Sequence, residues 1–195
     1  MNIPERIEAL RGLMATNGID VYFIPSYDFH GTRYTADYWR SQRWISGFTG
    51  SGGIIIITAD KAGLWVDSRY LIQALRELDG SGIEVYDICV QGARAYYNFL
   101  TANLPAGGKL GFDGRVLSVS VFDQLKAALS EKEIMYSYST DLIGELWHNR
   151  PPLPKWQAPR IQMVENKYTA HFLTAQGDVE QSPHREYSIS GYPIP

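Results

Sequence analysis

Residues 43–53 (RWISGFTGSGG), 54–57 (IIII) and 64–70 (LWVDSRY) decide the fold of this chain. The four isoleucines are too uniformly apolar for a strand with one wet face, so they predict a central strand that is covered on both faces. The segment 60–63 (DKAG) predicts a tight turn, after which residues 63–67 return as the hairpin partner. A glycine-dense turn therefore leads into the sheet, and a polar cluster follows the second strand.

Alternating helix and strand patterns surround this hairpin. Apolar residues at three- and four-residue steps predict a helix between Pro4 and Gly18, and residues 20–25 follow as a buried strand. After the hairpin, a helix is predicted from Ser68 to about Gly80. Strands near 83–88, 109–113 and 133–138 then alternate with helices near 92–103, 119–130 and 141–147. This order predicts an α/β fold with a mixed central β-sheet and helices on both faces.

The composition changes after residue 150. We expect one domain over residues 1–150, a proline-rich linker over 151–160, and a tail over 161–195 without a clear fold. Four prolines within nine residues favour an extended linker. A disordered tail, a truncation, a change of reading frame and an engineered end would each explain the last segment. No internal repeat is visible.

Bulk composition narrows the function classes. Of the 195 residues, 45% are apolar, which suffices for a core, and the formal net charge of −3 argues against a nucleic-acid or anionic-membrane partner. No apolar run approaches the length of a membrane span, and the first residues lack the core of a signal peptide. We therefore expect a cytoplasmic protein. Cys89, the single cysteine, allows no intrachain disulfide and is predicted to be buried at a strand end.

Arg69 is the first candidate for a binding residue. It follows Asp67 at the carboxyl end of a predicted strand and opens a predicted helix, where ligands of α/β sheets gather. Its planar fork of donors suits a peptide carboxylate or carbonyl. The alternative is an ion pair within the domain, between Arg69 and Asp67 or another acid.

Several common catalytic sites are disfavoured. The glycine-rich segment lacks the lysine of a phosphate loop and leads into a strand, which also excludes a dinucleotide fingerprint and a serine nucleophile elbow. Asp67 and Asp113 both end predicted strands, so a two-carboxylate magnesium site of the nuclease type is conceivable, but no basic surface accompanies it. The four histidines are scattered. We expect neither catalytic residues nor metal ligands in this chain.

The order of the segments, with residues 24–30 (IPSYDFH) upstream and 147–151 (WHNRP) downstream, resembles the amino-terminal domain of Xaa-Pro aminopeptidases. These enzymes form the aminopeptidase P branch of the creatinase/prolidase family. The resemblance covers residues from about 4 to 155 and implies a ribonuclease-H-like arrangement. It also implies that the pita-bread catalytic domain, with its two divalent ions, usually manganese, lies outside this chain, which itself needs no cofactor.

The resemblance also assigns roles to site residues. In the family, the arginine of an Asp-Gly-Arg-Tyr motif reaches bound substrate in the neighbouring subunit, and Asp67, Arg69 and Tyr70 match that motif, with Ser68 in place of glycine. Asp28 and His30 match a second motif of the family, an Asp-x-His pair. We expect them mainly to stabilise the conformation of their loop, and secondarily to line the substrate gorge. Where the family usually carries glutamate before a tyrosine, this chain has Arg33 before Tyr34.

Two functions from different classes follow. The first is a non-catalytic domain of an Xaa-Pro aminopeptidase that is inactive alone, associates with itself or with a full-length aminopeptidase P subunit, and completes a neighbour's channel for proline-containing peptides. The second is a stand-alone dimerisation or regulatory module without peptidase activity. An aromatic loop favours the second: Tyr27, Phe29, Tyr34, Tyr38 and Trp39. A third, weaker alternative places the same domain in creatine- or dipeptide-cleaving relatives.

Overall fold

The computed structural model describes residues 1–32, 35–92, 94–153, 172–173 and 179–180. They belong to two units, Met1–Leu153 and Pro154–Pro195. In the second unit, β7 (Phe172–Leu173) pairs antiparallel with β8 (Val179–Glu180). The rest of the predicted tail, and most of the predicted linker, lie outside the described residues. All that follows concerns the first unit.

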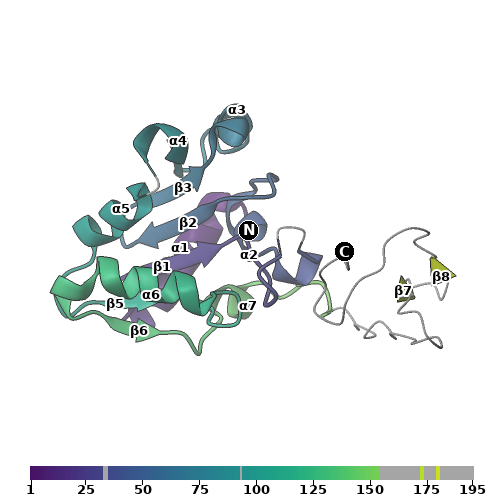
Figure 1. The fold of residues 1–195 in the computed structure, drawn as a ribbon. Coiled ribbons are helices and arrows are strands. Elements are labelled where there is room, and N and C mark those ends of the chain that lie inside the picture. The colour runs from purple at the N-terminus through teal and green to yellow at the C-terminus, as the bar shows by residue number, and fades with distance from the viewer. Residues whose placement is uncertain (33–34, 93, 154–171, 174–178, 181–195) are drawn as a thin grey trace, which may run out of the picture. The chain divides into compact units, whose positions relative to one another are not determined.

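A six-stranded mixed sheet forms the centre of the first unit (Figure 1). Its order is β4-β3-β2-β1-β5-β6, and β2 alone runs against its two neighbours, so the other five strands share one direction. The predicted α/β architecture is confirmed. The strands are β1 (Val21–Pro25), β2 (Ile54–Thr58), β3 (Ala62–Val66), β4 (Glu84–Asp87), β5 (Lys109–Gly111) and β6 (Met135–Ser137).

The isoleucine run is a central strand, as predicted. In β2, Ile55 and Ile57 face one core cluster and Ile56 faces the other, and all three are fully buried. Successive side chains of a strand point to opposite faces, so a strand covered on both sides needs apolar residues at every position. The antiparallel partner β3 places Leu64 beside Ile55, which confirms the predicted hairpin.

Helices cover both faces of the sheet. Helix α1 (Ile3–Thr16) packs in one cluster with α2 (Ser41–Ser46), α3 (Ser68–Glu77) and α7 (Leu142–Leu146). Helices α5 (Ala95–Asn103) and α6 (Val119–Ala128) pack in the other cluster, in front of the sheet in the view of Figure 1. The described part of the unit also contains two short 3-10 turns, η1 (Asp37–Trp39) and η2 (Ser130–Lys132).

Local sequence explains the ends of α1. Asn2 accepts a hydrogen bond from the backbone of Glu5, whose side chain in turn accepts one from the Asn2 amide, so a capping box opens the helix. Pro4 sits in the first turn, where its missing N–H costs nothing. Gly18, with φ of 61°, lets the chain leave the helix and enter β1.

The region after β4 differs from the prediction. The helix predicted near 92–103 is α5, but an additional short helix that was not predicted, α4 (Ile88–Gln91), precedes it, and Gly92 with φ of 87° follows α4. Cys89 was predicted to be a buried strand end, and this is wrong: it lies in α4 and is exposed. The physical reason is Asp87, whose carboxylate accepts the Cys89 amide at 2.8 Å and so starts a helical turn directly after the strand.

Candidate functional site at the carboxyl edge of the sheet

One edge of the sheet collects every candidate residue. The carboxyl ends of β1, β3, β4, β5 and β6 meet there with the beginning of β2, because β2 alone runs in the opposite direction. Asp28 and His30 follow β1, and Asp67, Arg69 and Tyr70 follow β3. In open α/β sheets this edge is where ligands bind. The strand β2 separates the two groups.

Asp67 and Arg69 form a two-point ion pair. Arg69 Nε donates to Asp67 Oδ1 at 3.1 Å, and Nη2 donates to Oδ2 at 2.7 Å. Asp67 is also the N-cap of α3, because the same Oδ1 accepts the Arg69 amide at 2.9 Å. The hydrogen bonds that the Arg69 guanidinium donates to the Asp67 carboxylate raise the pKa of Arg69. The pair lies at the surface, where the Arg69 side chain is 69% exposed.

Ser68 fits this turn without strain. It is the first residue of α3, so the glycine conformation that the family motif suggests is not needed at this position. The Ser68 hydroxyl donates to Asp87 Oδ2 at 2.8 Å, which ties the start of α3 to the end of β4. Serine therefore adds a contact between two neighbouring strand ends that glycine cannot make.

Helix α3 holds the glycine-rich segment in place. Tyr70 OH lies 2.6 Å from Ser51 Oγ, and Glu77 accepts hydrogen bonds from both the amide and the hydroxyl of Thr49. The pKa of Glu77 lies below its ordinary value, because the hydrogen bonds that Thr49 and Gln73 donate to its carboxylate outweigh the opposing effect of burial. The segment is therefore fixed against the helix that carries Arg69.

Aromatic side chains pack on and beside the glycine-rich segment. Phe48 is fully buried and meets Tyr70 edge to face, with ring centroids 6.1 Å apart. Trp44 stacks on Trp147 with ring centroids 5.6 Å apart and lies beneath the guanidinium of Arg6. The reason is α7, whose end brings Trp147 beside α2.

Asp28 organises the loop after β1. Its buried carboxylate accepts the amides of His30 and Thr32, at 3.0 and 2.9 Å, and also the Thr32 hydroxyl. The pKa of Asp28 lies below its ordinary value, because these hydrogen bonds outweigh the opposing effect of burial. His30 packs against Phe29 with ring centroids 3.7 Å apart. Arg33 and Tyr34 lie outside the described residues.

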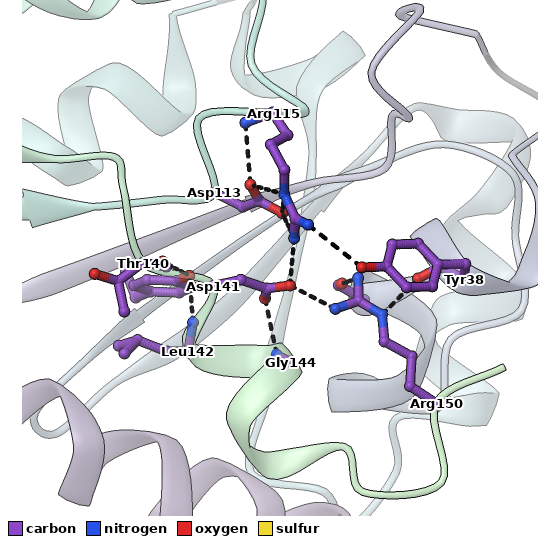
Figure 2. A network of polar contacts seen from close by, with 10 residues as sticks. Tyr38, Asp113, Arg115, Thr140, Asp141, Leu142, Gly144 and Arg150 are labelled. Carbon is purple, nitrogen blue, oxygen red and sulfur yellow. Dashed lines mark hydrogen bonds and ion pairs between the residues drawn. The ribbon is translucent and has the colours of Figure 1, made fainter. Parts of the chain in front are cut away.

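Sequence reasoning missed a polar network at the end of β5, drawn in Figure 2. Asp113 and Arg115 repeat the geometry of Asp67 and Arg69: the aspartate accepts the arginine amide at 3.0 Å, Nε at 2.9 Å and Nη2 at 2.8 Å. The hydrogen bonds that Arg115 donates to the Asp113 carboxylate raise the pKa of the Arg115 guanidinium, although its partial burial opposes this. The sequence offers one sign of this network: the pattern Asp-x-Arg occurs after two different strands, at residues 67–69 and 113–115.

The network continues to the end of the domain (Figure 2). Asp141 Oδ2 accepts Arg115 Nη2 at 2.6 Å and Arg150 Nη1 at 2.5 Å, while its Oδ1 caps α7 through the Gly144 amide. Arg150 also donates from Nε to the carbonyl of Tyr38 at 2.7 Å. The segment after α7 is thereby joined to η1 and to the end of β5.

The charged groups of this edge are engaged with each other. Asp67 and Asp113 each hold their own arginine, so the conceivable two-aspartate magnesium site receives no support from the geometry. Within the described ranges, no group of three or more histidine, cysteine, aspartate or glutamate side chains is arranged to hold a metal ion. None of the helices in the described part of the chain combines the length and apolarity of a membrane span.

Comparison with known proteins identifies this architecture. Residues 6–141 match the family model of the creatinase/prolidase N-terminal domain. The chain belongs to this family. Aminopeptidase P2 of Arabidopsis thaliana is 34% identical over 163 residues, which make up 82% of this chain and 23% of the plant protein. The predicted resemblance to Xaa-Pro aminopeptidases is confirmed.

Solved structures support the same assignment. The X-prolyl aminopeptidase of Caenorhabditis elegans, a cytosolic enzyme with a di-nuclear active site, is 28% identical with a TM-score of 0.69, over 79% of this chain and 27% of that one. The N-terminal domain of the cytoplasmic peptidase PepQ from Mycobacterium tuberculosis is 27% identical with a TM-score of 0.55, over 73% of this chain and 98% of that domain. The chain spans about a quarter of the length of the curated relatives it matches.

Proposed function

We propose that this chain acts as the non-catalytic N-terminal domain of an Xaa-Pro aminopeptidase, an enzyme that removes the residue before proline from a peptide amino terminus. The domain associates with a second copy or with a full-length aminopeptidase P subunit, and it completes that neighbour's substrate channel. The similarity to several Xaa-Pro aminopeptidases supports this proposal.

The observation that carries the proposal is the presentation of Arg69. Asp67 takes two of the five N–H donors of the guanidinium, so three remain for an outside acceptor. The side chain is 69% exposed yet aligned by the ion pair and by the first turn of α3. A pre-aligned fork of this kind loses little conformational entropy when it binds a peptide carbonyl or carboxylate.

The remaining candidates have supporting roles in this proposal. Tyr70 and the glycine-rich segment give α3 a fixed position, and Asp28 and His30 shape the loop on the other side of β2. The two divalent ions of the parent enzyme, manganese in our proposal, belong to its catalytic domain, and the peptide is cleaved there. We place the assembly in the cytoplasm, without a nucleic-acid or membrane partner.

Activity measurements test the proposal. The pure chain, supplied with Mn²⁺, is expected not to hydrolyse an Xaa-Pro peptide. A chimera in which this chain replaces the matching segment of Arabidopsis aminopeptidase P2 is expected to hydrolyse it, and the plant enzyme without that segment is expected to be weaker. Turnover by the pure chain contradicts the proposal, as does a truncated plant enzyme with full activity.

A second candidate is a stand-alone dimerisation or regulatory module. The predicted aromatic loop supports it only in part, because Tyr27 and Phe29 are exposed whereas Trp39 is buried. A better reason is the outer side of α3, where Ile72 and Leu75 are 65% and 55% exposed and are neighbours on one helix face. Both candidates allow a dimer of the pure chain, so the activity of the chimera distinguishes them: a chimera no more active than the truncated plant enzyme favours the module. Sedimentation then locates the interface of the module, because its dimer is expected to dissociate on Ile72→Glu.

A further inference from the structure

The crevice in which open α/β sheets usually bind a ligand lies between the ends of β1 and β5 in this fold. These two strands are parallel neighbours, and the chain leaves them in opposite directions along the sheet. After β1 it continues through α2 to β2, and after β5 through α6 to β6, with α2 in one core cluster and α6 in the other. The ends of two such strands diverge and form a topological switch point, where ligands bind.

In this chain the crevice is filled by Trp39. Its side chain is 6% exposed and, together with Pro25 at the end of β1 and Asp113 after β5, it lines a remaining cavity of about 10 Å³. A cavity of this size is at the lower limit for a single water molecule. The indole of η1 therefore occupies the place that a ligand would take at such a switch point.

Arg115 and Tyr38 hold the indole in the crevice. The guanidinium carbon of Arg115 lies 5.2 Å from the centroid of the Trp39 ring, and this cation is itself held by Asp113 and Asp141 (Figure 2). Tyr38 meets Trp39 edge to face at 4.7 Å, and its hydroxyl accepts a hydrogen bond from Arg115 at 3.3 Å. The polar network at the end of β5 thereby sets the position of Trp39.

Trp39 in turn supports the exposed end of the loop after β1. Its ring lies 5.3 Å from that of Phe29, and the Phe29 ring lies 3.7 Å from the imidazole of His30. Phe29 is 46% exposed, so its packing against the buried indole limits where its ring can lie. The Asp28 carboxylate fixes the backbone of this loop, whereas Trp39 and Phe29 fix the direction of its side chains.

We propose that Trp39, clamped by Arg115, is the residue that positions Phe29 and His30 on the surface that meets the substrate. Because the crevice is closed, a peptide can contact the domain here only at the rim, where Phe29 and His30 lie. Trp39 does not touch the peptide and acts through these two side chains. The role in substrate binding rests on the proposed function, whereas the positioning of the two side chains does not.

Nuclear magnetic resonance of the full chain tests the positioning. The imidazole C–H signals of His30, assigned by their loss in His30→Gln, are recorded about two pH units above the ordinary pKa of histidine, where the ring is neutral. The ring current of the stacked Phe29 displaces these signals from those of a solvent-exposed histidine. Phe29→Leu removes the aromatic ring and defines the full change.

Matched variants separate positioning from general packing. Trp39→Leu is expected to move the His30 signals toward their positions in Phe29→Leu. Trp44→Leu makes the same change in a tryptophan of α2 that stacks elsewhere, and it is expected to leave the signals in place. Arg115→Gln, at a side chain that is 46% exposed, is expected to move them in the same direction even if Trp39→Leu fails to fold. Signals unmoved by Arg115→Gln or by a folded Trp39→Leu, or moved equally by Trp44→Leu, overturn the inference.

The chimera with Arabidopsis aminopeptidase P2 tests the consequence for substrate binding. Trp39→Leu is expected to raise KM about fivefold with little change in kcat, because binding that is shared by the ground state and the transition state is weakened. Trp44→Leu is expected to leave both constants unchanged. A chimera that responds to Arg69→Ala but not to Trp39→Leu overturns this inference alone. A chimera that ignores Arg69→Ala contradicts the proposed function, and the His30 signals then still decide whether Trp39 positions the loop.

Discussion

Arg69 and Arg115 each form the same two-point pair with the aspartate two residues before them, at the ends of β3 and β5. The Nη2–Oδ2 distances are 2.7 Å for Arg69 with Asp67 and 2.8 Å for Arg115 with Asp113. The two ion pairs differ in their surroundings. Arg115 also contacts Asp141, whereas the Arg69 side chain remains 69% exposed. One pair therefore belongs to a network within the domain, and the other leaves the Arg69 side chain mostly exposed to solvent.

Removal of the Arg69 side chain is expected to leave the domain folded. Because the pair is exposed, Arg69→Ala should not change Tm measurably in the isolated chain, as exposed ion pairs contribute little to stability. The measurement is thermal unfolding followed by circular dichroism. A fall in Tm of many degrees would mean that the pair is a structural element and would weaken the proposed role in substrate binding.

Removal of Asp141 is expected to destabilise the domain. Its side chain is 17% exposed, joins two arginines and caps α7, so Asp141→Ala leaves the mostly buried Arg150 without its carboxylate partner. The expected loss is about 2–4 kcal/mol in the free energy of unfolding, measured by urea titration. Asp123→Ala, an exposed aspartate of α6, serves as the control and should change stability by less than about 0.5 kcal/mol. Equal effects of both substitutions would contradict the network's role.

A methyl group at Gly50 is expected to disturb the glycine-rich segment. A Cβ there would lie 2.3 Å from Phe48 Cζ and 3.0 Å from Tyr70 Cδ1, and Phe48 is fully buried. Gly50→Ala should cost about 1–3 kcal/mol in the free energy of unfolding.

The matched control for Gly50 lies in α1. Gly12 has open space around its Cβ position, so Gly12→Ala should stabilise the chain by about 1 kcal/mol through helix propensity. Urea unfolding measures both variants. A neutral Gly50→Ala would show that the Phe48 ring moves easily.

The loop after β1 is expected to weaken in acid. The pKa of Asp28 is lower in the folded chain than its ordinary value of 3.8, since hydrogen bonds from Thr32 and His30 outweigh burial. The unfolded chain then binds more protons, so this stabilisation is full above the ordinary pKa and is lost as pH falls through the folded one. Asp28→Asn should cost about 2 kcal/mol near pH 6 and progressively less as the pH falls below 3.8. A cost independent of pH contradicts the assignment.

Local patterns in the sequence predicted most of the fold. The isoleucine run required a strand buried on both faces, and the three- and four-residue spacing before Gly18 required a helix. Capping by side chains was harder to anticipate: Asp87 starts α4 by accepting the Cys89 amide, so a residue that looked like the end of a strand became an exposed helical one. Boundaries of this kind depend on a single hydrogen bond rather than on periodicity.

The candidate site was predictable only where its residues are close in sequence. Asp67 and Arg69 are two residues apart, and their pairing was stated as an alternative from the start. The partners Asp141 and Arg150 join Asp113 and Arg115 through packing of α7 on the sheet, which no local pattern encodes. The same holds for Trp44, because its stacking partner Trp147 is about a hundred positions away in the chain.

The most direct test of the central claim is the kcat/KM of the chimera with Arabidopsis aminopeptidase P2 for an Xaa-Pro peptide, compared between wild type and Arg69→Ala. Our account predicts a loss of about tenfold or more, as expected when a charged contact to bound substrate is removed, with unchanged Tm. Arg76→Ala, also on α3, should retain full activity. An Arg69→Ala chimera as active as wild type would contradict the proposal that this domain completes the substrate channel.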